Sequence, residues 1–307
     1  MAFKSVVDVQ EKLGSVSYIS SKEIATVVYL AGATKKPVLV EGPAGVGKTE
    51  LAKSVAECLK RDLIRMQCYE GLDESKALYE WEYAKQLLYT QIIKDKINDV
   101  ISESSTLAEA IDQIAGHEDA FFSHRFIQTR PLLQAISSPE PVVLLIDEID
   151  KSDPEFEAFL LELLSDFQVT IPELGTIKAK THPFVFLTSN NYRDMSDALK
   201  RRCIHIYIDY PAIETEMEIV RLKIPGIDEA LLKKIVTMVA RIRELDLKKK
   251  PCISETLDWA RSLIALQIND LSPEIVTSTL NTLCKHKTDY DVVKNNILTV
   301  TRQTSQC

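Results

Sequence analysis

Residues 42–49 combine three glycines with a lysine and a threonine at a spacing suited to holding phosphate groups. They read Gly42-Pro43-Ala44-Gly45-Val46-Gly47-Lys48-Thr49, and Glu50 follows directly. The glycines let the backbone wrap closely, so that successive N–H groups point inward at phosphate oxygens. Lys48 is expected to reach the β- and γ-phosphates of a nucleotide, and the Thr49 hydroxyl to bind Mg²⁺. The alternative is a glycine-rich turn that binds nothing.

Two acids follow a second apolar run further along the chain. Residues 142–146 are all valine, leucine or isoleucine, and Asp147 and Glu148 come next. Acids at the end of a buried strand are costly unless they serve a cation or a cleft. Asp147 is expected to hold Mg²⁺ through water, and Glu148 to deprotonate the attacking water as the general base. An Asp-Glu pair alone often caps a helix, but together with the phosphate loop it predicts nucleotide hydrolysis.

Polar and basic residues after two later apolar runs complete the candidate site. Asn190 follows Thr188-Ser189 and is expected to place the attacking water beside the γ-phosphate, although Asn190-Asn191 also suits a turn. Arg201 and Arg202 lie at the end of a predicted helix, where cations also complement the helix dipole. The functional interpretation is an arginine finger offered to a neighbouring subunit, with Arg202 the better candidate and Arg201 the second.

The elements that must position these residues alternate between strand and helix patterns. Five short apolar runs are predicted to be buried strands, at residues 37–41, 63–67, 142–146, 184–187 and 204–208. Between them, apolar residues recur at helical spacing. Such alternation predicts an α/β fold, with a mostly parallel sheet and helices on both faces. After residue 210 only helix-period patterns remain, so we expect an α/β domain over 1–210 and a helical domain over 211–307.

Composition argues against nucleic-acid-binding, membrane-spanning and secreted proteins. The net charge of −8 argues against sequence-independent nucleic-acid binding, which draws on clustered cations. No apolar stretch suggests a membrane helix, and the first residues lack the pattern of a secretory signal, so a cytoplasmic location is expected. The six cysteines form no C-x-x-C pair and are expected to be reduced, mostly buried thiols.

With these residues assembled, the chain resembles a MoxR-type AAA+ ATPase, and within that family the CoxD-like subgroup associated with maturation of carbon monoxide dehydrogenase. The resemblance covers nearly the whole chain. Beyond the nucleotide motifs it rests on residues 70–73, 83–88, 130–135, 145–151, 156–162, 171–176, 196–203 and 256–260.

The resemblance implies a P-loop AAA+ sandwich with a C-terminal all-helical lid, forming a homo-oligomer that is a hexameric ring with ATP between subunits. It also implies a partner with a von Willebrand factor A domain, and chaperone-like work on a protein client such as a molybdenum hydroxylase. One departure concerns the lid, where Glu255 occupies the position at which the family usually has a sensor-2 arginine. Arg261, six residues further on, is the possible substitute.

Two segments outside these motifs leave alternatives open. Residues 167–171 and 177–179, joined by a turn at 172–175, predict a hairpin that either faces the pore of a ring or lies at the sheet edge. The long connection 69–130 carries Tyr79, Tyr83 and Leu87 at helical spacing, a stripe that is more often core than a substrate grip.

Other functions were weighed against ATP-driven remodelling of proteins. A nucleic-acid-stimulated AAA+ motor or loader is the main alternative, and the acidic composition argues against it. A GTP-dependent module is disfavoured because residues 190–194 lack the lysine of a guanine-reading N-K-x-D motif. A nucleotide switch that barely hydrolyses is the remaining alternative, and single-turnover kinetics would distinguish it.

Overall fold

The computed structural model describes residues 2–89, 91, 126–171 and 175–302. A five-stranded parallel sheet forms its centre, in the order β2-β5-β8-β1-β9. The strands span β1 Val38–Glu41, β2 Leu63–Gln67, β5 Val143–Asp147, β8 Phe184–Ser189 and β9 Ile204–Tyr207. These are the five predicted strands, so the predicted α/β fold with a parallel sheet is confirmed.

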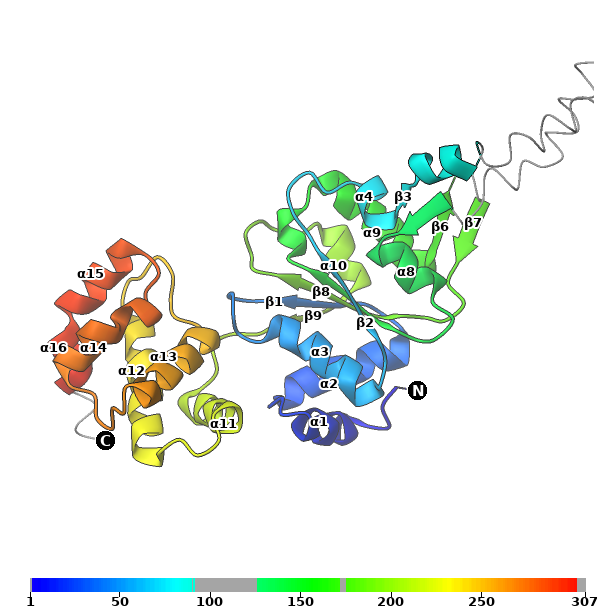
Figure 1. Ribbon diagram of the computed structural model, residues 1–307. Helices are drawn as coiled ribbons and strands as arrows, with labels where there is room; N and C mark the ends of the chain where they lie inside the picture. The colour runs from blue at the N-terminus through cyan, green and yellow to red at the C-terminus, as the bar shows by residue number, and fades with distance from the viewer. Residues whose placement is uncertain (1, 90, 92–125, 172–174, 303–307) are drawn as a thin grey trace, which may run out of the picture.

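Helices cover both faces of the sheet because side chains alternate along each strand (Figure 1). On β1, Val38 and Val40 pack into a core with the helices of one face, while Leu39 packs into a core with those of the other. The first layer contains α1 Val6–Ser15, α2 Lys22–Thr34 and α3 Lys48–Leu59. The second contains α4 Glu74–Leu78, α8 Pro131–Ser137, α9 Pro154–Asp166 and α10 Asp197–Arg202, with the 3₁₀ turn η2 Ile149–Lys151 beside it.

Side-chain caps fix the starts of α1 and α2, whereas α3 has none. Ser5 accepts a hydrogen bond from the Asp8 N–H at the start of α1, and Ser21 accepts one from the Ile24 N–H at the start of α2. Such caps satisfy backbone donors that have no partner within the helix. Local sequence therefore determines where the helices beside the phosphate loop begin.

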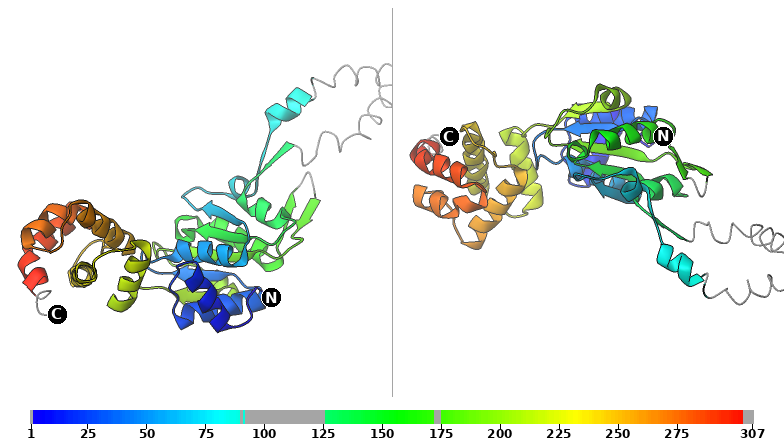
Figure 2. Two further views of the ribbon diagram at one scale, coloured as in Figure 1. Left: turned by 60° about the horizontal axis from the view of Figure 1, so that its bottom comes forward. Right: turned by 90° about the horizontal axis from the view of Figure 1, so that it is seen from above.

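Two small antiparallel sheets accompany the main one. Strands β6 Gln168–Ile171 and β7 Gly175–Lys178 form the predicted hairpin, at the end of the α/β part that is remote from the helical region (Figure 2). The hairpin forms its own sheet instead of extending the edge of the large one, and Val169 and Ile171 anchor it in the core. Pore contact stays a prediction, and residues 172–174 of the turn lie outside the described residues.

The prediction for residues 69–130 needs a correction. Tyr79 lies in strand β3 Tyr79–Trp81, which pairs with β4 Ile127–Thr129, so it does not belong to a helical stripe. Tyr83 and Leu87 are 73% and 61% exposed, so they are not core residues among the part of the chain that is described. Spacing alone was misleading because the chain changes from strand to helix between these residues. Residues 90 and 92–125 lie outside the described residues.

Beyond β9 the described elements are all helical. They are α11 Ile213–Lys223, α12 Glu229–Glu244, α13 Ile253–Ala265, α14 Pro273–Thr279, η3 Leu280–Thr282, α15 Lys287–Asn295 and α16 Ile297–Arg302. Their apolar residues form a separate core, with Trp259 fully buried at its centre. The predicted division at residue 210 falls between β9 and α11 and stays a proposal. None of the described helices is both long and apolar enough to cross a membrane.

A buried ion pair joins three elements of this helical region. Arg243 of α12 donates to both carboxylate oxygens of Glu216 on α11, at 2.5 and 2.8 Å, and to the Pro251 carbonyl oxygen at 2.7 Å. Thr256 of α13 donates to Glu216 at 2.7 Å. Removing one member leaves the other charge buried without a partner.

We expect Arg243→Met to lower the free energy of unfolding by about 3–5 kcal/mol, because Glu216 would lose its buried counter-charge. Urea unfolding followed by circular dichroism measures the change. Arg221→Met is the matched control, since Arg221 pairs with Glu229 at the surface, where water screens the attraction and little stability is expected to be lost. Equal effects of the two substitutions would contradict the expectation.

The five cysteines within the described residues form no disulfide. Cys68, Cys203, Cys252 and Cys284 are buried, and Cys58 is partly exposed. Burial raises the pKa of the Cys68 and Cys203 thiols to about 12. The expected burial is confirmed for four of these five thiols, and their reduced state stays a prediction.

Candidate functional site

The phosphate loop connects the end of β1 to the start of α3. Gly42 has φ of +146°, and a Cβ there would lie 2.0 Å from the Ile208 carbonyl oxygen. Gly45 has φ of +74°, and its Cβ would lie 2.1 Å from the Cys252 sulfur. Gly47 precedes α3 with φ of +98°. Backbone conformation therefore favours glycine at all three positions, and lack of space also requires it at Gly42 and Gly45.

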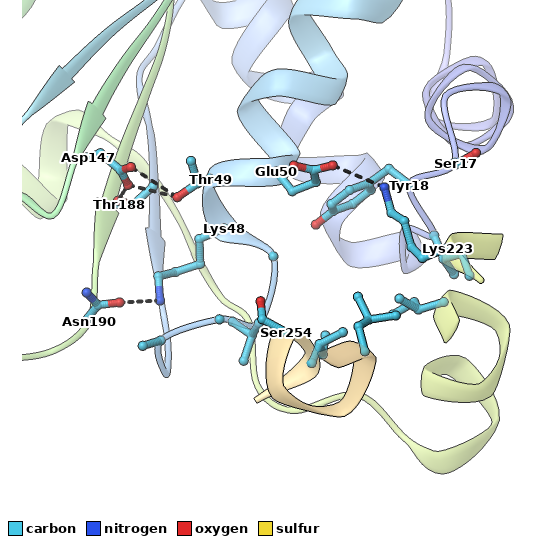
Figure 3. A pocket seen from close by; sticks show the side chains of 18 of the residues that line it. Ser17, Tyr18, Lys48, Thr49, Glu50, Asp147, Thr188, Asn190, Lys223 and Ser254 are labelled. Atoms are coloured by element: carbon cyan, nitrogen blue, oxygen red, sulfur yellow. Dashed lines mark hydrogen bonds and ion pairs between the residues drawn. The ribbon is translucent and has the colours of Figure 1, made fainter. Parts of the chain in front are cut away.

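The Lys48 ammonium group is buried inside this loop. It donates to the Gly42 and Pro43 carbonyl oxygens, both at 2.6 Å, and to Asn190 Oδ1 at 2.8 Å (Figure 3). Burial lowers the pKa of Lys48 to about 8, against the opposing effect of nearby acids such as Asp150 and Asp147. An anion entering the loop would stabilise the charged form of this lysine.

Thr49 and Asp147 meet at the carboxyl edge of the sheet. The Thr49 hydroxyl donates to Asp147 Oδ1 at 3.0 Å, and the Thr188 hydroxyl also donates to that oxygen. Asp147 is only 3% exposed. A hydroxyl beside a carboxylate is the oxygen donor set that Mg²⁺ prefers, so these residues fit the predicted metal site.

Arg65 of β2 is an unpredicted partner of Asp147. Its Nε and Nη2 atoms donate to Asp147 Oδ2 at 3.1 and 2.6 Å. Strands β2 and β5 are neighbours in parallel register, which brings Arg65 beside the acid. The sequence shows that the predicted strand 63–67 contains a cation. Which acid this cation contacts depends on the order of the strands in the sheet.

Glu148 is held between several donors just after β5. Gln67 Nε2 donates to Glu148 Oε2 at 2.8 Å, Asn190 Nδ2 donates to Oε1 at 3.3 Å, and Lys151 forms an ion pair with the carboxylate. The backbone of Glu148 is left-handed, with φ of +58°, a conformation that residues with a Cβ adopt at a cost. The amide of Asn190 thus joins Lys48 to Glu148, and its role in placing the attacking water stays a proposal.

Asp150 keeps Asn190 in this position. Its Oδ2 atom accepts hydrogen bonds from the backbone N–H groups of Asn190 and Tyr192, both at 2.9 Å, and the residue is 1% exposed. Its structural function depends on β5 and β8 being adjacent, which their separation along the chain does not reveal.

The phosphate loop and the two acids line a cavity of about 450 Å³ between the sheet and the helical region. The loop contributes residues 44–50 to its walls, and Asp147, Glu148, Thr188 and Asn190 contribute from the ends of β5 and β8. Sequence analysis missed the remaining lining residues, which are Ser17, Tyr18, Ile19, Ile219, Lys223, Ile253, Ser254 and Leu257. Their apolar members suit the flat face of a nucleotide base. Burial also raises the pKa of the Tyr18 phenol.

Glu255, the residue at the sensor-2 position, stabilises the start of a helix and does not line the cavity. Glu255 accepts a hydrogen bond from the Cys252 N–H at 2.8 Å, which caps α13. Arg261 pairs with Asp258 at the surface and does not line the cavity. Within the described residues, the lid cation that lines the cavity is Lys223, whose Nζ lies 3.3 Å from Glu50 Oε1.

The predicted finger residues lie away from this cavity. Arg201 and Arg202 end α10 and are exposed, and Arg202 Nε donates to Ser165 Oγ at 2.8 Å. Neither residue lines the cavity of its own chain. A finger acting on a neighbouring subunit would have this placement, and the role stays a proposal.

A phosphate loop at the carboxyl edge of a parallel sheet, facing two acids, defines a P-loop nucleotide-binding protein. Residues 37–203, more than half of the chain, match the family model described as "AAA domain (dynein-related subfamily)". The chain belongs to this family of AAA+ proteins and is an ATPase.

Individual relatives are distant. An uncharacterised protein of Staphylococcus saprophyticus is 25% identical over 238 residues, which cover 75% of this chain and 76% of that protein. The gas vesicle ATPase GvpN of Haloferax mediterranei is 26% identical over 219 residues, 68% of this chain and 57% of the relative. A structure of the RuvB Holliday junction branch migration motor of Thermotoga maritima covers 95% of this chain and 77% of that chain, with a TM-score of 0.49 and 16% identity.

Proposed function

We propose that this AAA+ ATPase works as a MoxR-type, chaperone-like remodeller, in which ATP hydrolysis between subunits of a ring changes the conformation of a protein partner. The observation that carries the proposal is the cavity shared by the phosphate loop, the two acids and the helical region. A nucleotide in that cavity contacts both parts of the chain. Its hydrolysis therefore changes the contacts that hold the lid against the sheet.

The residues of the cavity have separate roles in this reaction. Lys48 exchanges its loop carbonyl partners for the β- and γ-phosphate oxygens of ATP. Thr49, with Asp147 acting through water, holds Mg²⁺, which supplies neutralising charge at the phosphates when bound. Asn190 orients the attacking water, and Glu148 takes its proton as the water oxygen bonds to the γ-phosphorus and the bond to ADP breaks. The products are ADP and inorganic phosphate.

The ring is the part of the proposal that involves Arg202. Phosphoryl transfer needs charge stabilisation on the γ-phosphate, and the cavity of one chain offers Lys48 for this purpose. The exposed Arg202 supplies a second cation to the cavity of the next subunit, with Arg201 as the alternative. A homo-hexamer with six shared sites follows from the resemblance to MoxR-type ATPases.

We expect mixtures of Arg202→Ala and Lys48→Ala chains to recover ATPase activity that neither chain has alone. In an equal mixture, about a quarter of the interfaces would pair an intact loop with an intact arginine, so about a quarter of wild-type turnover is expected. Steady-state phosphate release measures it. Arg201→Ala mixed in the same way is the comparison, and absence of recovery at every mixing ratio would exclude Arg202 as a finger in trans.

The proposed partners are a von Willebrand factor A domain protein and a client such as a molybdenum hydroxylase in the cytoplasm, as in the CoxD-like subgroup. The first test is the identity of the neighbouring genes, one of which we expect to encode a von Willebrand factor A protein. We expect it to bind the ATP-loaded Glu148→Gln ring in sedimentation and to release on exchange to ADP. Binding that is independent of the nucleotide, or a chain that stays monomeric with ATP, would contradict the proposal.

A further inference from the structure

A second cavity, of about 210 Å³, lies at the opposite edge of the large sheet. Its walls include Lys35 and Lys36, just before β1, and His182, just before β8. The strands are parallel, so the residues that precede them lie at the amino edge, whereas the phosphate loop lies at the carboxyl edge. Arg61, which follows α3, also lines this cavity. The cavity is therefore separate from the nucleotide site.

The charged residues in its walls all have the same sign. Lys35, Lys36 and Arg61 are cationic, His182 is titratable, and the lining contains no acid. Among the described residues, no carboxylate forms an ion pair with these three cations. Burial lowers the pKa of Arg61, and burial together with Lys35 lowers that of His182. Burial alone gives the direction at Arg61, whereas at His182 the charge of Lys35 adds to the effect of burial.

Helix dipoles neutralise only part of this charge. Helices α2 and α3 both end beside the cavity, and a helix C-terminus carries about half a negative charge. Two termini supply about one negative charge against three cations, which leaves about two positive charges. Lys35 also has φ of +56°, a left-handed conformation in which glycine or asparagine is usual. Lysine is thus present there in spite of a backbone cost.

One ring nitrogen of His182 contacts the backbone, so the other ring nitrogen is available to a ligand. Nδ1 lies 3.0 Å from the Pro183 carbonyl oxygen, and the ring packs 4.0 Å from that of Phe167, measured between centroids. With Nδ1 donating to the carbonyl, Nε2 becomes a donor to an anion once the ring is protonated. The guanidinium of Arg61 adds the forked donor geometry that matches phosphate oxygens.

We propose that this cavity binds a small phosphate-bearing anion, held by Lys35, Lys36 and Arg61 with His182. A phosphate group carries about two negative charges near neutral pH, which matches the uncompensated charge. A water molecule takes about 30 Å³ of the liquid, so the cavity has room for inorganic phosphate or pyrophosphate. The ligand is therefore a compact phosphate compound, either inorganic or organic.

The test uses Lys48→Ala protein, in which the phosphate loop no longer competes for the probe. Isothermal titration with pyrophosphate at low salt should give one saturable site per chain. Arg61→Gln in this background should weaken binding at least about tenfold, since it removes a charge-assisted contact. The control, Lys22→Gln, removes the same charge at the opposite end of α2 and should leave the affinity within about twofold.

Two additional measurements complete the test. If Arg61→Gln protein does not fold, as judged by its melting temperature, Lys36→Gln replaces it with the same expectation. Titration with inorganic phosphate and with glycerol 3-phosphate separates the two sources, because only a site for organic phosphates binds the ester as tightly as the inorganic ion. Absence of saturable pyrophosphate binding, or equal affinity in the Arg61→Gln and Lys22→Gln proteins, would overturn the proposal.

Discussion

Replacing Glu148 by glutamine is expected to stop ATP hydrolysis while leaving ATP bound. The carboxylate lies at the end of β5, where Gln67 and Asn190 orient it towards the cavity. Glutamine has nearly the same shape, but its amide does not accept the proton of the attacking water. A general base contributes about 10²- to 10⁴-fold to a rate, so turnover should fall by that factor. The nucleotide contacts of Lys48 and Thr49 remain.

Two measurements on the same preparation test this expectation. Phosphate release should fall as described, while the Kd for ATP stays within about threefold, because the phosphate loop is unchanged. Glu155→Gln is the control, since it makes the same chemical change on an exposed residue of α9. Turnover that survives in Glu148→Gln protein would assign the base to another residue.

Replacing Lys48 by alanine is expected to have the second large effect, on nucleotide binding itself. The ammonium group donates to two loop carbonyls and to Asn190, and phosphate oxygens are stronger partners than these carbonyls. Two lost charge-assisted bonds are worth about 3 kcal/mol or more, which is roughly a hundredfold in Kd. Loss of the lysine also leaves Gly42 and Pro43 without their side-chain donor.

Titration with a fluorescent ATP analogue measures the affinity of the Lys48→Ala protein. Lys53→Ala is the matched control, because Lys53 is an exposed lysine of the same helix that pairs with Glu50 at 3.7 Å. We expect the control to bind ATP nearly as well as the unmodified chain. An unchanged affinity in Lys48→Ala would remove the assignment of residues 42–49 as the phosphate loop.

The parts of the site that sequence analysis predicted are those fixed by local spacing. The phosphate loop is one continuous segment, and Asp147 and Glu148 directly follow a strand that is apolar throughout. Carboxyl ends of parallel strands share one edge, so a mostly parallel sheet was enough to bring Thr49, Asp147 and Asn190 together. Their contacts in the structure agree with that argument.

The parts that sequence analysis missed depend on which elements are neighbours. Arg65 and Gln67 reach the two acids only because β2 lies beside β5 in the sheet. Tyr18 and Lys223 reach the cavity from helical regions on either side, and no periodicity in their segments indicates this. The position of Glu255 was identified from the resemblance, but its function as a cap follows from the hydrogen bond to Cys252.

At the contact between Gly45 and Cys252, the helical region packs directly against the phosphate loop. A lid sulfur occupies the space where any other residue at position 45 would carry its side chain. Close-packed surfaces of this kind have discrete arrangements and do not deform gradually. We therefore expect α13, whose N-cap is Cys252, to shift with the loop backbone when phosphates enter or leave. We expect the absent side chain of Gly45 to couple the nucleotide to the helical region through packing, alongside the cation Lys223 in the cavity wall.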